Sequence, residues 1–281
     1  MEVCEMADID IIKKCEVAAR RIRRRIIDMT YGTGNTGAHL GGSLSLVELL
    51  AGLYAGTIRY KTDDPAWEDR DRVIFSKGHG ALALYPTLVE GGIISEEELT
   101  TFKQDGSRLC GHPTLNGLPG IEFASGSLGQ GLSLGVGVCL ALKRKNNHRS
   151  RVFVLLGDGE CDEGSIWEAA ASASHFELNQ LVAVVDMNAI QYDGFTAEIM
   201  RMEPFESKWK AFGWDVIAID GHNIGEILDA YSHRGDKPVA ILAHTVKGKG
   251  ISFMENNWKY HNASLSKSLY EQAVEELEKT E

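Results

Sequence analysis

The chain has 281 residues, of which 43% are hydrophobic and 8% aromatic, a composition typical of a globular protein with room for a sizeable core. Its formal net charge of −11 argues against a dedicated nucleic-acid binder, because such proteins cluster Lys and Arg to neutralise phosphates. No apolar run approaches the roughly 18 residues that a membrane helix needs, and Met1 is not followed by a basic and apolar leader. We therefore expect one domain over residues 1–281, with neither a nucleic-acid nor a membrane partner.

The cysteines indicate the redox compartment. There are five, an odd number, and no two form a CxxC pair: Cys4, Cys15, Cys110, Cys139 and Cys161. This pattern fits neither a disulfide framework nor a structural zinc site, and it predicts a protein of the reducing cytoplasm.

The first predicted element is an amphipathic helix over residues 9–28. Its apolar face is expected to hold Ile9, Ile12, Val17, Ile22 and Ile26. The arginines between residues 20 and 25 alternate with isoleucines, so we interpret them as a solvated helix face. A glycine-rich loop over residues 32–43 and a second helix over 44–58 should follow. The GxGxxG pattern at 32–37 follows a helix rather than a strand, which makes a dinucleotide fingerprint improbable.

Later segments alternate between helical and strand patterns. Helices are expected after Gly80, Leu128 and Gly164, and a surface helix over residues 265–281. Short β-rich apolar runs occupy residues 152–156, 181–185, 216–219 and 239–243. The alternation predicts an α/β fold with a mostly parallel sheet flanked by helices on both faces.

Polar residues follow two of these runs directly. Gly157, Asp158 and Gly159 end the run at 152–156, and Asn188 comes thirty residues after Asp158 at the end of the next run. Ligands of open parallel sheets collect at the carboxyl ends of strands. A carboxylate and an amide oxygen suit a hard divalent cation that keeps its other positions for phosphate and water. Taken alone, Gly-Asp-Gly would more often be a tight turn, but its spacing to Asn188 resembles the thiamine diphosphate fingerprint.

Four of the nine histidines lie in glycine-containing or irregular segments: His39, His79, His112 and His261. A single histidine of this kind is more often a packed or capping residue. Four on loops that could converge at one sheet edge are harder to explain structurally, because imidazoles can bind phosphate or sugar hydroxyls and shuttle protons.

At these positions the sequence resembles the transketolase family, from about residue 10 to about residue 266. The motifs occur in the family's order and include 39–45 (HLGGSLS), 71–79 (DRVIFSKGH), 111–113 (GHP), 126–131 (GSLGQG), 157–159 (GDG), 220–222 (DGH) and 247–250 (KGKG). Ala38 and Asn262 stand where glycine is commoner in the family, which affects only the expected loop geometry.

The resemblance implies a cofactor and the residues that bind it. Asp158, Asn188 and the carbonyl of Ile190 would bind Mg²⁺, or Ca²⁺ or Mn²⁺, bridging the diphosphate of thiamine diphosphate. The other implied cofactor-binding residues are His79, Gly126, Leu128, Gly157, Gly159 and Glu168. The implied catalytic residues are His39, His112 and His261, which would meet the sugar and assist its proton transfers, and Glu163. Glu163 and Glu168 match acidic residues that face the other half of the active site.

The resemblance also implies a partner. Transketolase chemistry needs a glutamate that activates the aminopyrimidine ring, which the family carries on a second, pyrimidine-binding domain. We therefore expect this chain to be the N-terminal subunit of a split transketolase, which pairs with a C-terminal subunit in an α2β2 assembly and moves a two-carbon ketol unit from ketose phosphate to aldose phosphate. One alternative is a subunit of a related enzyme, such as deoxyxylulose-phosphate synthase or a transketolase for an unusual sugar. Another is a non-catalytic assembly or regulatory subunit, against which the three substrate-facing histidines weigh.

Overall fold

The computed structural model describes residues 8–279 and is built around one five-stranded parallel sheet. The strands are β1 (Arg72–Phe75), β2 (Val152–Gly157), β3 (Leu181–Met187), β4 (Asp215–Asp220) and β5 (Val239–His244), in the order β1-β2-β3-β5-β4. Four of them coincide with the predicted apolar runs. The fifth, β1, has only four residues, too few to show a pattern before the Ser76-Lys77-Gly78 turn begins. The predicted α/β class is confirmed.

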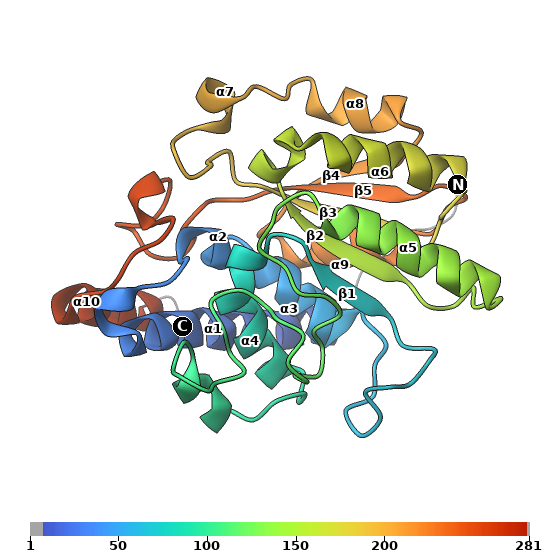
Figure 1. Ribbon diagram of the computed structural model, residues 1–281. Helices are drawn as coiled ribbons and strands as arrows, with labels where there is room; N and C mark the ends of the chain where they lie inside the picture. Colours follow the sequence, from blue (N-terminus) through green and yellow to red (C-terminus); the bar gives the residue numbers. More distant parts are fainter. Residues whose placement is uncertain (1–7, 280–281) are drawn as a thin grey trace.

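Helices cover both faces of the sheet (Figure 1). One layer holds α1 (Ile9–Gly32), α3 (Val47–Gly56), α4 (Ala81–Glu90) and α9 (Ile224–Ser232). The opposite layer holds α5 (Gly131–Arg144), α6 (Gly164–His175) and α8 (Phe205–Ala211). Side chains of β2 alternate between the two layers, with Phe153 and Leu155 in the first core and Val152, Val154 and Leu156 in the second. Burial on both faces explains why the strands are continuously apolar.

The remaining helices are short or peripheral. They are α2 (Gly41–Leu44), α7 (Thr196–Ile199) and α10 (Lys267–Glu278), which packs against α1. Single 3₁₀ turns span Gly34–Thr36, Gly78–Gly80, Glu97–Thr101, Gly159–Asp162 and Trp258–Tyr260. Within residues 8–279, no helix combines the length and apolarity needed to cross a membrane.

The structure corrects two expectations for α1. Ile22 and Ile26 are buried as predicted, but Ile9 and Val17 are exposed, because the buried face is completed by smaller side chains: Cys15, Ala18 and Ala19. Arg23 does not belong to a solvated face. Its guanidinium is buried, donates to Glu48 Oε1 at 2.5 Å and contacts the carbonyl of Lys249.

Two predicted boundaries were also wrong. The helix expected over residues 44–58 is α3, which is shorter and begins at Val47, and the separate short helix α2 lies almost wholly in the expected glycine-rich loop. The predicted tail helix is shorter and ends at Glu278. The segment 32–37 begins at the last residue of α1, so a helix rather than a strand precedes it, as predicted. Four cysteines are free thiols in the structure, and Cys4 lies outside the described residues.

Candidate functional site

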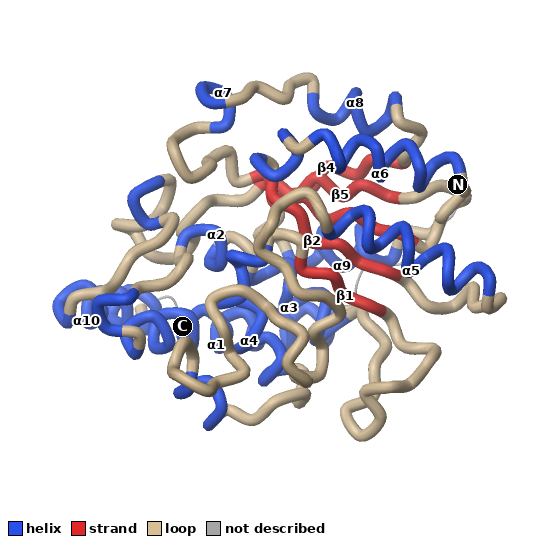
Figure 2. The backbone as a smooth tube through the Cα atoms, viewed as in Figure 1, coloured by secondary structure: helices blue, strands red, loops and turns tan. Residues whose placement is uncertain are grey.

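The polar motifs meet at the carboxyl edge of the sheet. Asp158 follows β2, Asn188 follows β3 and Lys247 follows β5. These strands are neighbours, and the register pairs Gly157 with Asp186. Figure 2 shows in tan the long loops that link the strands to the helices and carry the other motif residues.

Asp158 and Asn188 are buried side by side at this edge. The two carboxylate oxygens of Asp158 accept hydrogen bonds from the Gly159 N–H at 2.8 Å and from the Ala189 N–H at 2.6 Å. The Oδ1 atom of Asn188 accepts from the Ile190 N–H at 3.2 Å. Burial raises the pKa of Asp158 to about 6, and the neighbouring Asp186 contributes to this rise. A cation at this carboxylate would offset that unfavourable burial.

Asp186 lies behind this pair and is fully buried. Its carboxylate accepts from Lys77 Nζ and Thr245 Oγ1, from Ser45 Oγ at 2.6 Å and from Asn188 Nδ2 at 2.9 Å. Burial acts to raise the pKa of Asp186, but Lys77 and the hydrogen bonds outweigh it and hold the pKa below its ordinary value. The bond to Nδ2 fixes the Asn188 amide so that Oδ1 points away from Asp186.

A second buried carboxylate, Glu160, supports the loops around the Gly-Asp-Gly turn. It accepts from Ser76 Oγ, from the Gly129 N–H at 2.9 Å and from the Gly157 N–H at 3.0 Å. Glu160 therefore joins the ends of β1 and β2 to the loop before α5. The roles of Glu160, Asp186 and Lys77 could not be predicted from the sequence, because nothing in the local pattern distinguishes these residues from surface charges.

The structure brings the four loop histidines together. The ring centroid of His39 lies 5.7 Å from that of His79, 5.3 Å from that of His112 and 5.4 Å from that of His261. The rings of His79 and His261 are 5.3 Å apart. Tyr192, which sequence analysis did not select, is exposed and lies edge-on to His261 with ring centroids 5.1 Å apart.

The clustered imidazoles are neutral at pH 7. Burial lowers the pKa of His39 to about 4, helped by His112, Lys103 and Lys247. Burial lowers the pKa of His261 to about 3, helped by Lys247. The same cause holds the pKa values of His79 and His112 below their ordinary value. Each ring therefore offers one donor and one acceptor nitrogen.

Lys247 sets which nitrogen of His261 carries the proton. Its buried Nζ lies 3.0 Å from His261 Nδ1 and donates to the Ile190 carbonyl at 2.6 Å. Burial lowers the pKa of Lys247 to about 8, with Lys77 adding to the effect, so the group is still mainly protonated at pH 7. An ammonium can only donate. Nδ1 therefore accepts, and the proton of His261 resides on Nε2.

The loops of His39 and His261 are joined by backbone pairing. Ala38 and Ala263 exchange two N–H···O bonds of 3.0 Å. The loops approach so closely at Gly37, whose φ is 66°, that a Cβ there would lie 2.7 Å from the Ala263 carbonyl carbon. Ala38 and Asn262 have no positive φ, so the two departures from the family's glycines introduce no strain.

The other predicted cofactor residues have varied surroundings. Gly126, with φ 144°, packs beneath the His112 ring, so that a Cβ would lie 3.4 Å from its Cδ2. Leu128 is partly buried on the same loop, and Ser125 beside it has a buried hydroxyl without a partner in the described structure. Glu163 and Glu168 are exposed at the start of α6, outside the histidine cluster.

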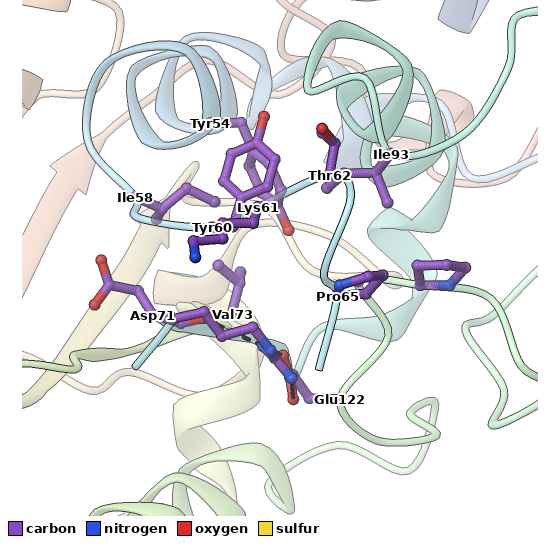
Figure 3. Close-up of a pocket in the computed structure, with 13 residues that line it drawn as sticks. Tyr54, Ile58, Tyr60, Lys61, Thr62, Pro65, Asp71, Val73, Ile93 and Glu122 are labelled. Atoms are coloured by element: carbon purple, nitrogen blue, oxygen red, sulfur yellow. Dashed lines mark hydrogen bonds and ion pairs between the residues drawn. The ribbon is translucent and has the colours of Figure 1, made fainter. Parts of the chain in front are cut away.

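Two other features are separate from this site. His222, from the 220–222 motif, bridges Glu48 Oε2 at 2.9 Å and the Val246 N–H at 2.8 Å, which is a structural role. A cavity of about 70 Å³ lies next to β1 and is lined chiefly by apolar side chains (Figure 3). Tyr54, Ile58, Val73 and Ile93 contribute to its wall, and none of the clustered histidines does.

Comparison with known proteins identifies the family. Residues 16–279 match the model described as "Transketolase, thiamine diphosphate binding domain". The chain is 44% identical to the 6-deoxy-6-sulfo-D-fructose transketolase subunit SqwG of Clostridium sp. (strain MSTE9), covering 86% of this chain and 88% of that protein. It is 39% identical to an apulose-4-phosphate transketolase subunit of Phocaeicola vulgatus, covering 95% and 94%.

A solved structure agrees with this identification. The transketolase of Campylobacter jejuni superposes with a TM-score of 0.85 at 29% identity, covering 96% of this chain and 43% of that longer chain. The matches in sequence and structure thus cover the sheet, the Asp158–Asn188 pair and all four clustered histidines. The chain belongs to the transketolase family and contains its thiamine diphosphate binding domain.

Proposed function

We propose that this chain is the N-terminal subunit of a two-subunit transketolase that moves a two-carbon ketol unit between sugar phosphates. The observation that carries the proposal is the position of four neutral imidazoles beside a buried carboxylate and amide at one sheet edge. A cofactor anchored by the carboxylate and the amide would present its reactive end to the imidazoles. A purely assembly-related subunit would have no need of such a cluster.

The proposed cofactor is thiamine diphosphate, held through Mg²⁺, or through Ca²⁺ or Mn²⁺. Asp158, Asn188 Oδ1 and the Ile190 carbonyl are hard oxygen donors that fit such an ion. Within residues 8–279, no three His, Cys, Asp or Glu side chains gather around a possible ion. The three proposed protein donors would leave the other positions of an octahedral ion open, and diphosphate oxygens and water would fill them. His79, Gly126, Leu128, Gly157 and Gly159 would line the pocket.

The bound cofactor supplies an electron sink for C–C cleavage. The protein's own residues would orient the sugar and move protons. Because Nδ1 of His261 accepts from Lys247, its Nε2–H would be the group that donates to a substrate oxygen. His39 and His112, uncharged and adjacent, would bind sugar hydroxyls and exchange protons with them. The unpartnered hydroxyl of Ser125 provides a further polar group close to this pocket.

The proposed partner is a C-terminal, pyrimidine-binding transketolase subunit in an α2β2 assembly. Two similar proteins bear names that designate them as subunits, and this chain spans only 43% of a full transketolase. Glu163 and Glu168, exposed at the start of α6, would face that partner. The unpaired Cys15, Cys110, Cys139 and Cys161 are consistent with the reducing cytoplasm that we propose as the location.

The substrate is proposed as a ketose phosphate donor and an aldose phosphate acceptor, the standard transketolase reaction. A specialised sugar is the second candidate, because the two similar proteins from Clostridium and Phocaeicola are named for 6-deoxy-6-sulfo-D-fructose and apulose 4-phosphate. An activity panel should therefore contain xylulose 5-phosphate with ribose 5-phosphate, together with these two sugars.

Reconstitution tests the proposal. The purified chain is mixed with a C-terminal transketolase subunit, thiamine diphosphate and Mg²⁺, and ketol transfer is followed for each donor. We expect no transfer by the chain alone and transfer by the mixture, with Asp158→Ala in the mixture as the inactive control. Robust turnover by the isolated chain would refute the need for a partner. A correctly assembled mixture that transfers nothing from any donor would favour a role in assembly alone.

A further inference from the structure

Lys103 lies in the loop that follows the 3₁₀ turn Glu97–Thr101 and has an unfavourable backbone conformation. Its φ is 58°, in the left-handed region where glycine or asparagine is preferred over a long side chain. The backbone is held there by a hydrogen bond of 2.9 Å from the Lys103 N–H to the Leu109 carbonyl. Glycine would occupy this position with less strain, so the presence of lysine suggests that its side chain is required.

The side chain extends between two loops that carry histidines. Its Nζ donates to the Gly37 carbonyl at 2.7 Å, two residues before His39. Its methylenes lie over Gly111, next to His112, where Cδ and Cε would each be 3.8 Å from a Cβ built on that glycine. In the described structure, the bond from Lys103 Nζ to the Gly37 carbonyl is the only hydrogen bond between the segments 33–39 and 101–113.

Lys103 is an exposed residue whose ammonium makes one hydrogen bond within the described residues, to the Gly37 carbonyl at 2.7 Å. Within residues 8–279, no carboxylate lies within ion-pair distance of its Nζ. The ammonium therefore acts through its carbonyl bond and through its field on the nearby imidazoles. The loop of His39 is already paired to that of His261 through Ala38 and Ala263. Lys103 supplies the remaining link, to the loop of His112.

We infer that Lys103 is a positioning residue that joins the loops of His39 and His112 and thereby sets the spacing of the imidazoles that receive the sugar. The inference rests on the proposed function for its catalytic consequence. In this role Lys103 does not bind the phosphate of the substrate. The electrostatic field of the ammonium supports the inference. Burial is the main cause of the lowered pKa of His112, and the charge of Lys103 is the second cause; the same charge also helps to lower the pKa of His39.

Three variants and one control test this role in the reconstituted enzyme. Lys103→Met keeps the methylenes over Gly111 but cannot donate to Gly37. Lys103→Arg keeps a donor, and Lys103→Gly removes the side chain while relieving the backbone. Lys143→Met is the matched control, because Lys143 Nζ also donates to a carbonyl, that of Phe176 at 2.8 Å, but at the far end of α5.

Catalysis provides the first readout. We expect Lys103→Met to lower kcat by about 10- to 100-fold, the effect of a small misplacement of catalytic groups. The loss should be equal for xylulose 5-phosphate and for unphosphorylated xylulose, and Lys103→Arg should restore most of it. Lys103→Gly should be as inactive as Lys103→Met without loss of thermal stability. A rise in KM confined to the phosphorylated sugar, or wild-type kcat in Lys103→Gly, overturns the inference.

The isolated chain provides a readout that does not depend on activity. In protein with ¹⁵N-labelled histidine, Lys103→Met should shift the ring resonances of His39 and His112. Those of His222, bonded to Glu48, should stay unchanged, and Lys143→Met should shift none of the three. Unchanged His39 and His112 signals overturn the inference. A wild-type mixture that is inactive with every donor instead counts against the proposed function and leaves this spectroscopic result to decide the role of Lys103.

Discussion

Replacing Asp186 with asparagine should destabilise the fold strongly. Asp186 is 0% exposed and Lys77 only 1%, and their side chains form an ion pair. Asp186→Asn keeps the shape and an acceptor oxygen for Ser45 and Asn188 but leaves the Lys77 ammonium without its counter-charge. Breaking a buried pair on one side costs about 3–5 kcal/mol. With a urea m-value of about 3 kcal/mol/M, the unfolding midpoint should fall by roughly 1–1.7 M.

Urea unfolding of the isolated chain, followed by circular dichroism, measures this shift. The companion variant is Lys77→Met combined with Asp186→Asn, which removes the charge as well as its partner. The double variant should be more stable than Asp186→Asn alone, because an unpaired buried charge is worse than a neutral pair. If Asp186→Asn unfolds within about 0.3 M of the wild type, or if the double variant is the less stable of the two, then the ion pair does not have the energetic role that we assign to it.

Three further outcomes are expected at the site itself. Asp158→Ala and Asn188→Ala, assembled with the partner, should each abolish Mg²⁺-dependent retention of thiamine diphosphate, and unchanged affinity by calorimetry would reject the metal assignment. His261→Ala should lower kcat/KM for the donor by roughly 100-fold or more while Tm and cofactor affinity stay normal; a destabilised variant with normal kinetics would remove His261 from the site. The pKa of Asp158 in the metal-free chain, about 6, is above its ordinary 3.8. Acidification therefore protonates the carboxylate and removes the free-energy cost of burying its charge in the metal-free fold. Protonation competes with the metal, so Mg²⁺ affinity should fall about tenfold per pH unit below pH 6, which calorimetry can measure.

The fold could be predicted from the sequence where burial imposes a pattern. Strands covered on both faces are continuously apolar, so β2, β3, β4 and β5 were found. The short strand β1 was missed, because its length leaves no pattern to read. The apolar face of α1 was partly wrong, since alanine and cysteine complete it where larger residues were expected. Arg23 was misjudged because its partner Glu48 lies on another helix.

The site could be predicted where glycines and strand ends constrain it. Gly157 to Gly159 and Asn188 follow strands, and the four histidines lie in loops that parallel topology brings to the same edge. Their convergence was therefore within reach of sequence reasoning. Lys103 was not, because a lysine in a polar loop looks like any surface lysine. Only its backbone conformation and its bond to Gly37, 66 residues earlier, distinguish it.

The residues that sequence reasoning missed share a physical role. Asp158 and Asn188 can be recognised by the ligand they suit. Asp186, which holds Asn188, lies at the end of β3, and its counter-charge Lys77 lies just after β1. Buried charges must be paired across the fold, and pairing across the fold leaves no local pattern. Lys247, which orients His261 from the loop after β5, also acts across the fold, but through the Ile190 carbonyl and the imidazole rather than through a carboxylate. Residues that meet the ligand are thus constrained by local chemistry, whereas residues that position them are constrained by charge compensation, and only the structure reveals the latter.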